Sequence, residues 1–206
     1  SLYEGVDFGE DGVTGLITYM RTDSTHIADS AVAEARGYIS ERFGKEYIPE
    51  APPKHKTRAK GAQEAHEAIR PTSAMRSPEK LKEYLNASQY KLYRLIWQRF
   101  IASQMATAIY NTLQVEVLGK ASAHEYLLRA SGSSIKFAGF LAVYADKRNL
   151  NKKKGDNGDE SVQIPDGLKE GQKQELDHLI PEQHFTQPPP RFSEASLVQA
   201  LEENGI

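Results

Sequence analysis

"LYRLIWQRFIASQMATAIYNTLQVEV", residues 92–117, determines the expected fold class, because the spacing of its apolar residues changes along its length. Helical spacing predicts a long amphipathic helix that begins at Ser88 and ends near Thr107. Its core-facing residues would be Leu92, Leu95, Ile96, Phe100 and Ile101. Beyond Asn111, "LQVEV" alternates apolar and polar residues, which is typical of a strand. The chain is therefore expected to be α+β, with helices before this point and antiparallel strands after it.

The residues before this stretch contain further helical patterns. Apolar residues recur every four positions and predict a helix over about residues 29–43. "GAQEAHEAI", residues 61–69, consists mostly of helix-compatible residues up to the break at Arg70-Pro71. Ser77-Pro78 is typical of an N-cap followed by proline at the first helical position. We therefore expect a mainly helical N-terminal half.

The residues after the stretch contain β patterns, a polar segment and a last helix. "EYLLRA", residues 125–130, and "SIKFAGFLAVY", residues 134–144, resemble strands, so an antiparallel module is predicted. Residues 146–161 are polar and lack periodicity, which indicates a mobile loop or linker. "SEASLVQALEEN", residues 193–204, is an amphipathic helix.

These patterns predict a division into three parts. Residues 1–108 would form a helical domain and residues 109–190 part of a β-rich domain, while residues 191–206 would begin a following helical domain. The chain starts without methionine and stops just after a helical pattern. We expect it to be a piece of a longer protein.

Composition limits the possible functions without selecting one. Of the 206 residues, 39% are hydrophobic and 26% are charged, as in soluble globular proteins. The formal net charge is -2, from 26 basic and 28 acidic residues, so a nucleic-acid partner would need a local basic patch. The chain contains no cysteine, which excludes disulfides, cysteine zinc sites and thiol nucleophiles. No signal peptide and no apolar stretch of about 20 residues is present, so an intracellular protein is expected.

The apolar run in "GLITYMRTDS", residues 15–24, predicts a strand followed by a turn. Side chains two residues apart on a strand lie on the same side, so Tyr19 and Arg21 would emerge together, with Thr18 and Met20 opposite. A tyrosine hydroxyl is ionised in only about one molecule in a thousand at neutral pH and needs activation to act as a nucleophile. Arg21 could bind a phosphate and stabilise charge during attack. From the spacing alone, a structural tyrosine beside a solvated arginine is the more common arrangement.

"AQEAHEAIRPT" offers a second polar surface. On a helix, Gln63, His66, Glu67 and Arg70 would form one stripe, from which His66 could donate to phosphate and Arg70 could bind an anion. The alternative is a solvated helix face with a His-Glu contact. The segment is not a zinc-protease motif, since Arg70 stands where a second histidine is required, and the other histidines show no metal-ligand spacing.

A basic loop precedes this segment. It contains Lys54, Lys56, Arg58 and Lys60 within "KHKTRAK", which would suit contact with a nucleic-acid backbone. Charge runs of this kind are also common in solvated loops. The loop is therefore a candidate DNA-binding element rather than a demonstrated one.

Two long motifs of the chain resemble a known family. "LYEGVDFG" with "GLITYMRTDST" is similar to the active-site segment of bacterial type IA DNA topoisomerases, and "AQEAHEAIRPT" is similar to a later segment. "LYRLIWQRFIASQM", "GFLAVY" and "HFTQPPPRFSEASLVQALEENGI" follow in the family's order, so the resemblance covers essentially the whole chain. Methionine between Tyr19 and Arg21 resembles the topoisomerase I branch.

The resemblance implies roles for three residues. Tyr19 would attack a DNA phosphodiester and become linked to the 5′-phosphate, Arg21 would contact the scissile phosphate, and His66 would contribute to DNA binding. Resealing would reverse the attack, so no ATP would be needed. Family members bind Mg²⁺ through an acidic Toprim domain that has no counterpart here, so no metal site is expected in this chain. It would correspond to the helical domain with the nucleophile and part of a β-rich arch.

Two hypotheses follow. The first is a piece of a type IA topoisomerase whose intact parent relaxes negatively supercoiled DNA, acting with its remaining domains in the bacterial cytoplasm at the nucleoid. The piece alone would have little or no relaxation activity, and weak, salt-sensitive binding to single-stranded DNA is expected. The second is a non-catalytic DNA-binding or hinge module that keeps the family scaffold.

Overall fold

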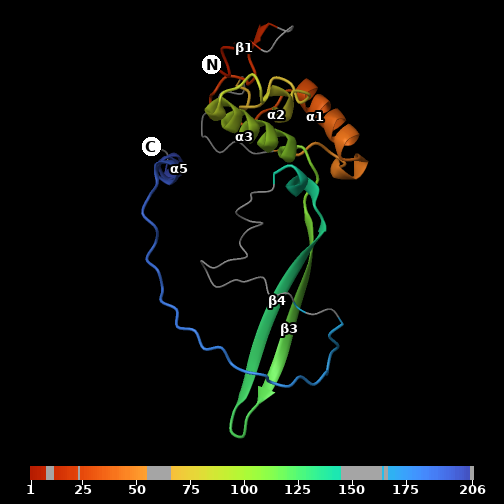
Figure 1. Cartoon of the computed structure of the whole chain (residues 1–206), viewed down its shortest axis with the longest axis vertical. Coiled ribbons are helices and arrows are strands. Elements are labelled where there is room, and N and C mark those ends of the chain that lie inside the picture. The colour runs from red at the N-terminus through yellow and green to blue at the C-terminus, as the bar shows by residue number, and fades with distance from the viewer. Residues whose placement is uncertain (8–11, 23, 55–65, 145–163, 165–166, 205–206) are drawn as a thin grey trace. The chain divides into compact units, whose positions relative to one another are not determined.

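The computed structural model describes residues 1–206 except 8–11, 23, 55–65, 145–163, 165–166 and 205–206. The chain falls into two compact units, Ser1–Ile164 and Pro165–Ile206. In the first unit, Figure 1 shows α1, α2 and α3 gathered in a helical head from which the β3–β4 ribbon extends. Helices and antiparallel strands are thus both present, and the α+β prediction is confirmed.

Helix α1, Asp29–Arg42, confirms the helix predicted over residues 29–43. It buries Ala31, Ala35 and Ile39 against the other elements of the head. The residue before the helix, Ala28, has no side chain that could cap it. Its backbone N–H instead donates to the Glu67 carboxylate at 2.9 Å, so a distant side chain caps this helix.

Helix α2, Pro78–Leu81, begins with the predicted proline, and helix α3, Ala87–Ser103, follows it. Asn86 and Gln89 form a capping box at the start of α3: the Asn86 side chain accepts from the Gln89 N–H, and the Gln89 side chain accepts from the Asn86 N–H. The helix ends four residues before the predicted Thr107.

The core face of α3 differs from the predicted one. Phe100 and Ile101 are buried as expected, whereas Leu92 and Leu95 are 49% and 52% exposed. Tyr93 and Trp97 occupy the core because backbone carbonyls satisfy their polar atoms: the Tyr93 hydroxyl donates to Arg76 O at 2.6 Å and the Trp97 indole N–H to Ala74 O at 3.0 Å. Burial raises the pKa of the Tyr93 hydroxyl above its ordinary value. The face of α3 that packs into the core is therefore the one that carries Tyr93 and Trp97, and Leu92 and Leu95 lie outside it.

Strands β3, Ile109–Lys120, and β4, Glu125–Phe137, form the predicted antiparallel module as a two-stranded ribbon. Residues on one face are mainly apolar, whereas the other face carries the ion pairs Glu116–Arg129 and Lys120–Glu125. The apolar face comprises Leu113, Val115, Val117, Tyr126, Leu128 and Ala130. Among these, Leu128 is 52% exposed and Tyr126 is 55% exposed.

The strand predicted over residues 134–144 stops at Phe137, and Gly139–Ala142 form the 3₁₀ helix η2. Gly139 has a φ of 49°, which favours glycine, and its backbone lies against residues 106–107. A Cβ there would lie 2.5 Å from Ala106 O. This close approach turns the chain back onto the head and ends the strand.

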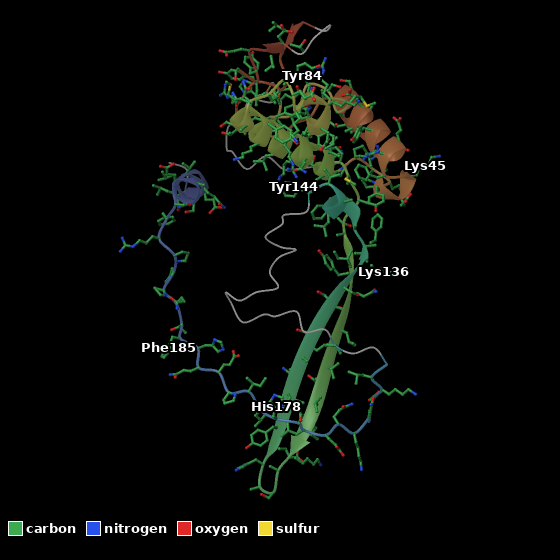
Figure 2. All side chains as sticks on the ribbon, viewed as in Figure 1. Lys45, Tyr84, Lys136, Tyr144, His178 and Phe185 are labelled. Atoms are coloured by element: carbon green, nitrogen blue, oxygen red, sulfur yellow. The ribbon has the colours of Figure 1, made fainter. Side chains whose placement is uncertain are left out.

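Five aromatic side chains, termed here the aromatic row, connect the core of the head to β4. The row runs through Trp97, Tyr38, Phe43, Tyr47 and Phe137, with successive ring centroids 5.4, 6.5, 5.8 and 4.8 Å apart. Tyr144, labelled in Figure 2 just after η2, adds a contact with Arg99, whose guanidinium lies 5.3 Å from its ring centroid. The ribbon is thus anchored through ring packing.

Two short strands complete the first unit: β1, Val6–Asp7, pairs antiparallel with β2, Val13–Thr14, and the 3₁₀ helix η1 spans Lys45–Tyr47. The second unit contains the predicted last helix, α5, Glu194–Asn204. No helix in the described parts of the chain is long and apolar enough to cross a membrane. The division at residues 108 and 190 stays a prediction.

Candidate functional site

The segment before Tyr19 is fixed by hydrogen bonds on both sides. Leu16 N–H donates to Leu2 O at 2.7 Å, and Leu16 O accepts from Thr72 N–H at 3.0 Å. Ile17 forms an isolated antiparallel bridge with Pro71, and Thr18 N–H donates to Arg70 O at 2.9 Å. The predicted strand is therefore reduced to one bridge, because the N–H groups that would extend the pairing bond elsewhere: Arg70 N–H donates to the Thr18 hydroxyl, and Leu16 N–H to Leu2 O.

The chain turns directly after this bridge. Arg21 N–H donates to Tyr19 O at 2.9 Å, a tight turn rather than a continued strand. The Tyr19 side chain is 58% exposed, whereas Leu16 and Ile17 before it are buried. A rigid core segment thus presents an exposed tyrosine at its end.

Residues 66–70, the described part of the predicted polar helix, are not helical. Their backbone groups bond to distant residues instead: Ala68 N–H donates to His26 O at 2.7 Å, and Arg70 N–H donates to the Thr18 hydroxyl at 2.9 Å. The Ser24 hydroxyl also donates to His66 O at 2.6 Å. The helical stripe over residues 66–70 was therefore a wrong prediction, and Gln63 lies outside the described residues.

A cavity of about 340 Å³ brings the main candidates together. Its lining residues are Tyr3, Thr18, Tyr19, Arg21, His66 and Glu67. Arg21 Nη1 lies 3.3 Å from His66 Nε2. Because a guanidinium only donates, Arg21 is the donor in this contact. An imidazole and a permanent cation thus lie beside the tyrosine, an arrangement suited to an anion.

Arg70 and Glu67 form an ion pair at the edge of this site. Arg70 Nε donates to Glu67 Oε1 at 2.8 Å, and Arg70 Nη1 donates to Pro71 O at 2.9 Å. Partial burial raises the pKa of the Glu67 carboxyl, but the hydrogen bonds from Arg70 and from Ala28 N–H outweigh burial and lower it overall. Arg70 does not line the cavity, so its predicted role in DNA binding stays a prediction.

The basic loop remains largely untested. Lys54 is exposed, whereas Lys56, Arg58 and Lys60 lie outside the described residues. The role of the loop in DNA binding stays a prediction.

In the part of the chain that the structure describes, no group of three or more histidine and acidic residues is placed to hold a metal ion.

Sequence reasoning missed two lining residues. Tyr3 is the nearest aromatic partner of Tyr19 that the structure records, with ring centroids 5.4 Å apart, and only its place in the "LYEG" motif could have drawn attention to it. Thr18 was expected to face away, yet it also lines the cavity. A larger cavity of about 620 Å³ lies between α1, α3 and η2 and contains none of the predicted site residues.

Comparisons with known proteins identify relatives of the chain as a whole. The family model described as DNA topoisomerase matches residues 1–206. DNA topoisomerase 1 from Xylella fastidiosa, in strains Temecula1 and 9a5c, is 46% identical over 205 residues, which are 100% of this chain and 24% of each relative. Full-length topoisomerase I from Thermotoga maritima matches with a TM-score of 0.71 and 35% identity, over 100% of this chain and 30% of that one. The chain belongs to the DNA topoisomerase family.

Proposed function

We propose that this chain carries the nucleophile of a type IA DNA topoisomerase, which relaxes negatively supercoiled DNA. The observation that supports the proposal best is the common cavity of Tyr19, Arg21 and His66, because residues separated by 45 positions meet there. The chain spans 24% of the length of the curated relatives it matches, so the activity belongs to the whole protein.

The chemistry follows from the three side chains. The Tyr19 hydroxyl oxygen attacks a backbone phosphorus, so a P–O bond forms and the P–O3′ bond breaks. The tyrosine proton is transferred to solvent or a base, and the leaving 3′-oxygen takes up a proton from solvent to become a hydroxyl. Arg21 binds the phosphate oxygens through charge-assisted hydrogen bonds. The bond energy is kept in the tyrosyl ester, so the 3′-hydroxyl can reverse the step without ATP.

His66 contributes to phosphate binding in two ways. Its contact with Arg21 restrains the guanidinium, and its backbone is held by Ser24. A ring N–H of His66 can also donate to a phosphate oxygen beside Arg21. DNA binding is then expected to weaken with added salt.

Mg²⁺ is part of the proposal for the intact enzyme. The cavity does not fit the ion, since Arg21 is cationic and Glu67, the one carboxylate among the described lining residues, is already bound to Arg70. Mg²⁺ would therefore be held by residues outside this chain. The proposed location is the bacterial cytoplasm at the nucleoid, with single-stranded and supercoiled DNA as partners.

The test uses a full-length topoisomerase that carries this chain. It should form a denaturation-resistant adduct with single-stranded DNA, and Tyr19→Phe should abolish the adduct while leaving oligonucleotide affinity within about twofold. Arg21→Ala should slow adduct formation by about 10²-fold or more. An adduct that survives Tyr19→Phe would overturn the proposal, and an intact protein that binds DNA without any adduct would favour a DNA-binding or hinge module.

A further inference from the structure

The ring of Tyr3 touches the ring of Tyr19 in the cavity. The centroids are 5.4 Å apart and the planes meet at 71°, an edge-to-face arrangement. This geometry is favoured for aromatic pairs because the positive edge of one ring meets the negative face of the other. The contact therefore restricts the orientations of the Tyr19 ring.

The backbone of Tyr3 is held on both sides. Leu2 before it is buried at 5% exposure, and Leu2 O accepts from Leu16 N–H at 2.7 Å. Gly5 N–H then closes a turn by donating to Ser1 O at 2.9 Å. Since Leu2 faces the core, the next side chain, Tyr3, projects away from it into the cavity.

Gly15 permits this arrangement. A Cβ at that position would lie 2.6 Å from Tyr3 O, so only glycine allows the turn to approach the Tyr19 segment so closely. Two segments, residues 1–5 and 15–19, are thus packed backbone to backbone, with one tyrosine from each lining the same cavity. The backbone that carries the Tyr3 ring is thus held against the segment that leads to Tyr19.

An exposed tyrosine needs such a surface to act as a nucleophile. Tyr19 is 58% exposed and would otherwise populate several rotamers, of which one places its hydroxyl for attack. We propose that Tyr3 is a positioning residue, which holds the Tyr19 ring in the orientation that attacks DNA. This inference rests on the proposed function of Tyr19. An edge-to-face pair biases a rotamer equilibrium by roughly three- to tenfold.

The experiment compares Tyr3→Ala, Tyr3→Phe and Tyr84→Ala in a full-length topoisomerase that carries this chain. Tyr84 is a matched control, since it is 48% exposed against 44% for Tyr3 and does not line the cavity. Adduct formation is measured in a single turnover with saturating oligonucleotide, and affinity is measured separately by fluorescence anisotropy. Tyr3→Ala should slow adduct formation by roughly three- to tenfold with affinity unchanged.

The other variants separate positioning from alternatives. Tyr3→Phe keeps the ring and should react at the wild-type rate, as should Tyr84→Ala. A wild-type rate for Tyr3→Ala would overturn the proposal. Slower adduct formation that is explained by weaker DNA binding would also overturn the proposal, because Tyr3 would then be a DNA contact. Tyr3→Leu, which keeps apolar bulk without a ring, should also be slow and serves if the alanine variant fails to fold.

A second measurement does not depend on activity. In the 206-residue chain, NMR should show ring-to-ring contacts between Tyr3 and Tyr19 and one dominant χ1 rotamer of Tyr19. Tyr3→Ala should spread Tyr19 over several rotamers, and an unchanged rotamer distribution would overturn the positioning role. If Tyr19→Phe kept the adduct, the proposed function would fail, whatever the rotamer measurement showed.

Discussion

Replacing Glu67 by alanine should destabilise the fold by removing one carboxylate that connects the start of α1 to the loop of residues 66–70. Glu67 Oε1 accepts from Ala28 N–H at 2.9 Å and from Arg70 Nε at 2.8 Å. Both donors lie in partly buried surroundings, and the side-chain exposures of Arg70 and Glu67 are 12% and 29%. The substitution therefore uncaps α1 and leaves a guanidinium without its carboxylate.

The magnitude follows from the two hydrogen bonds. Hydrogen bonds to a charged group contribute about 1.5–3 kcal/mol each, and solvent screening places these at the lower end, so Glu67→Ala should cost about 3 kcal/mol. Glu67→Gln keeps an acceptor oxygen but loses the charge, and should cost about 1 kcal/mol. Glu83→Ala, at an exposed glutamate, should change stability by less than about 0.5 kcal/mol.

Urea unfolding followed by the fluorescence of Trp97, the single tryptophan of the chain, measures all three variants. Trp97 is 5% exposed and lies in the core of the head, so its emission reports unfolding of the part that contains Glu67. A cost below about 1 kcal/mol for Glu67→Ala, or equal costs for the alanine and glutamine variants, would refute the reasoning.

The same carboxylate predicts a pH dependence. The pKa of Glu67 is lowered from its ordinary 4.5 in the folded chain, so its contribution is fully present above that value. It is lost as pH falls through the lower folded pKa, because the unfolded state then binds the proton more readily. The stability of Glu67→Gln should therefore fall less steeply below pH 4.5 than that of the wild type.

Three further substitutions test the fold. Gly139→Ala should cost about 2–4 kcal/mol in urea unfolding, because its φ is 49° and the new Cβ would meet Ala106 O. Gly37→Ala is its control, since nothing lies within 4 Å of a Cβ there and alanine should stabilise α1 by up to about 1 kcal/mol. Asn86→Ala should cost about 1 kcal/mol by removing the cap of α3, and an unchanged midpoint would contradict that assignment.

Local patterns predicted the elements well and their orientation less well. The helix at residues 29–42 and the ribbon follow from periodicity, which depends on neighbouring residues alone. Leu92 was misplaced because the rotation of α3 depends on Arg76 O and Ala74 O, which accept from Tyr93 and Trp97. No spacing within the helix contains that information.

The residues of the candidate site could also be predicted from local motifs, whereas the contacts between distant residues could not. Tyr19 and Arg21 lie in one short motif and could be paired from the sequence, and His66 was named from a second motif. The 3.3 Å contact between Arg21 and His66 depends on the loop of residues 66–70, whose helix-forming composition is overridden by bonds to Thr18 and His26. Long-range backbone hydrogen bonds of this kind leave no periodic signal.

The aromatic row anchors the ribbon at its base, so a small rotation at the base produces a larger movement at the tip. Strand β3 has 12 residues. At about 3.3 Å per residue such a strand reaches roughly 40 Å, so a tilt of about 5° at its base displaces the tip by roughly 3.5 Å. The base of the ribbon is held by the contact of Tyr47 with Phe137, whose ring centroids lie 4.8 Å apart. Small repacking around Trp97 would thus be amplified into a large displacement at the far end of the ribbon.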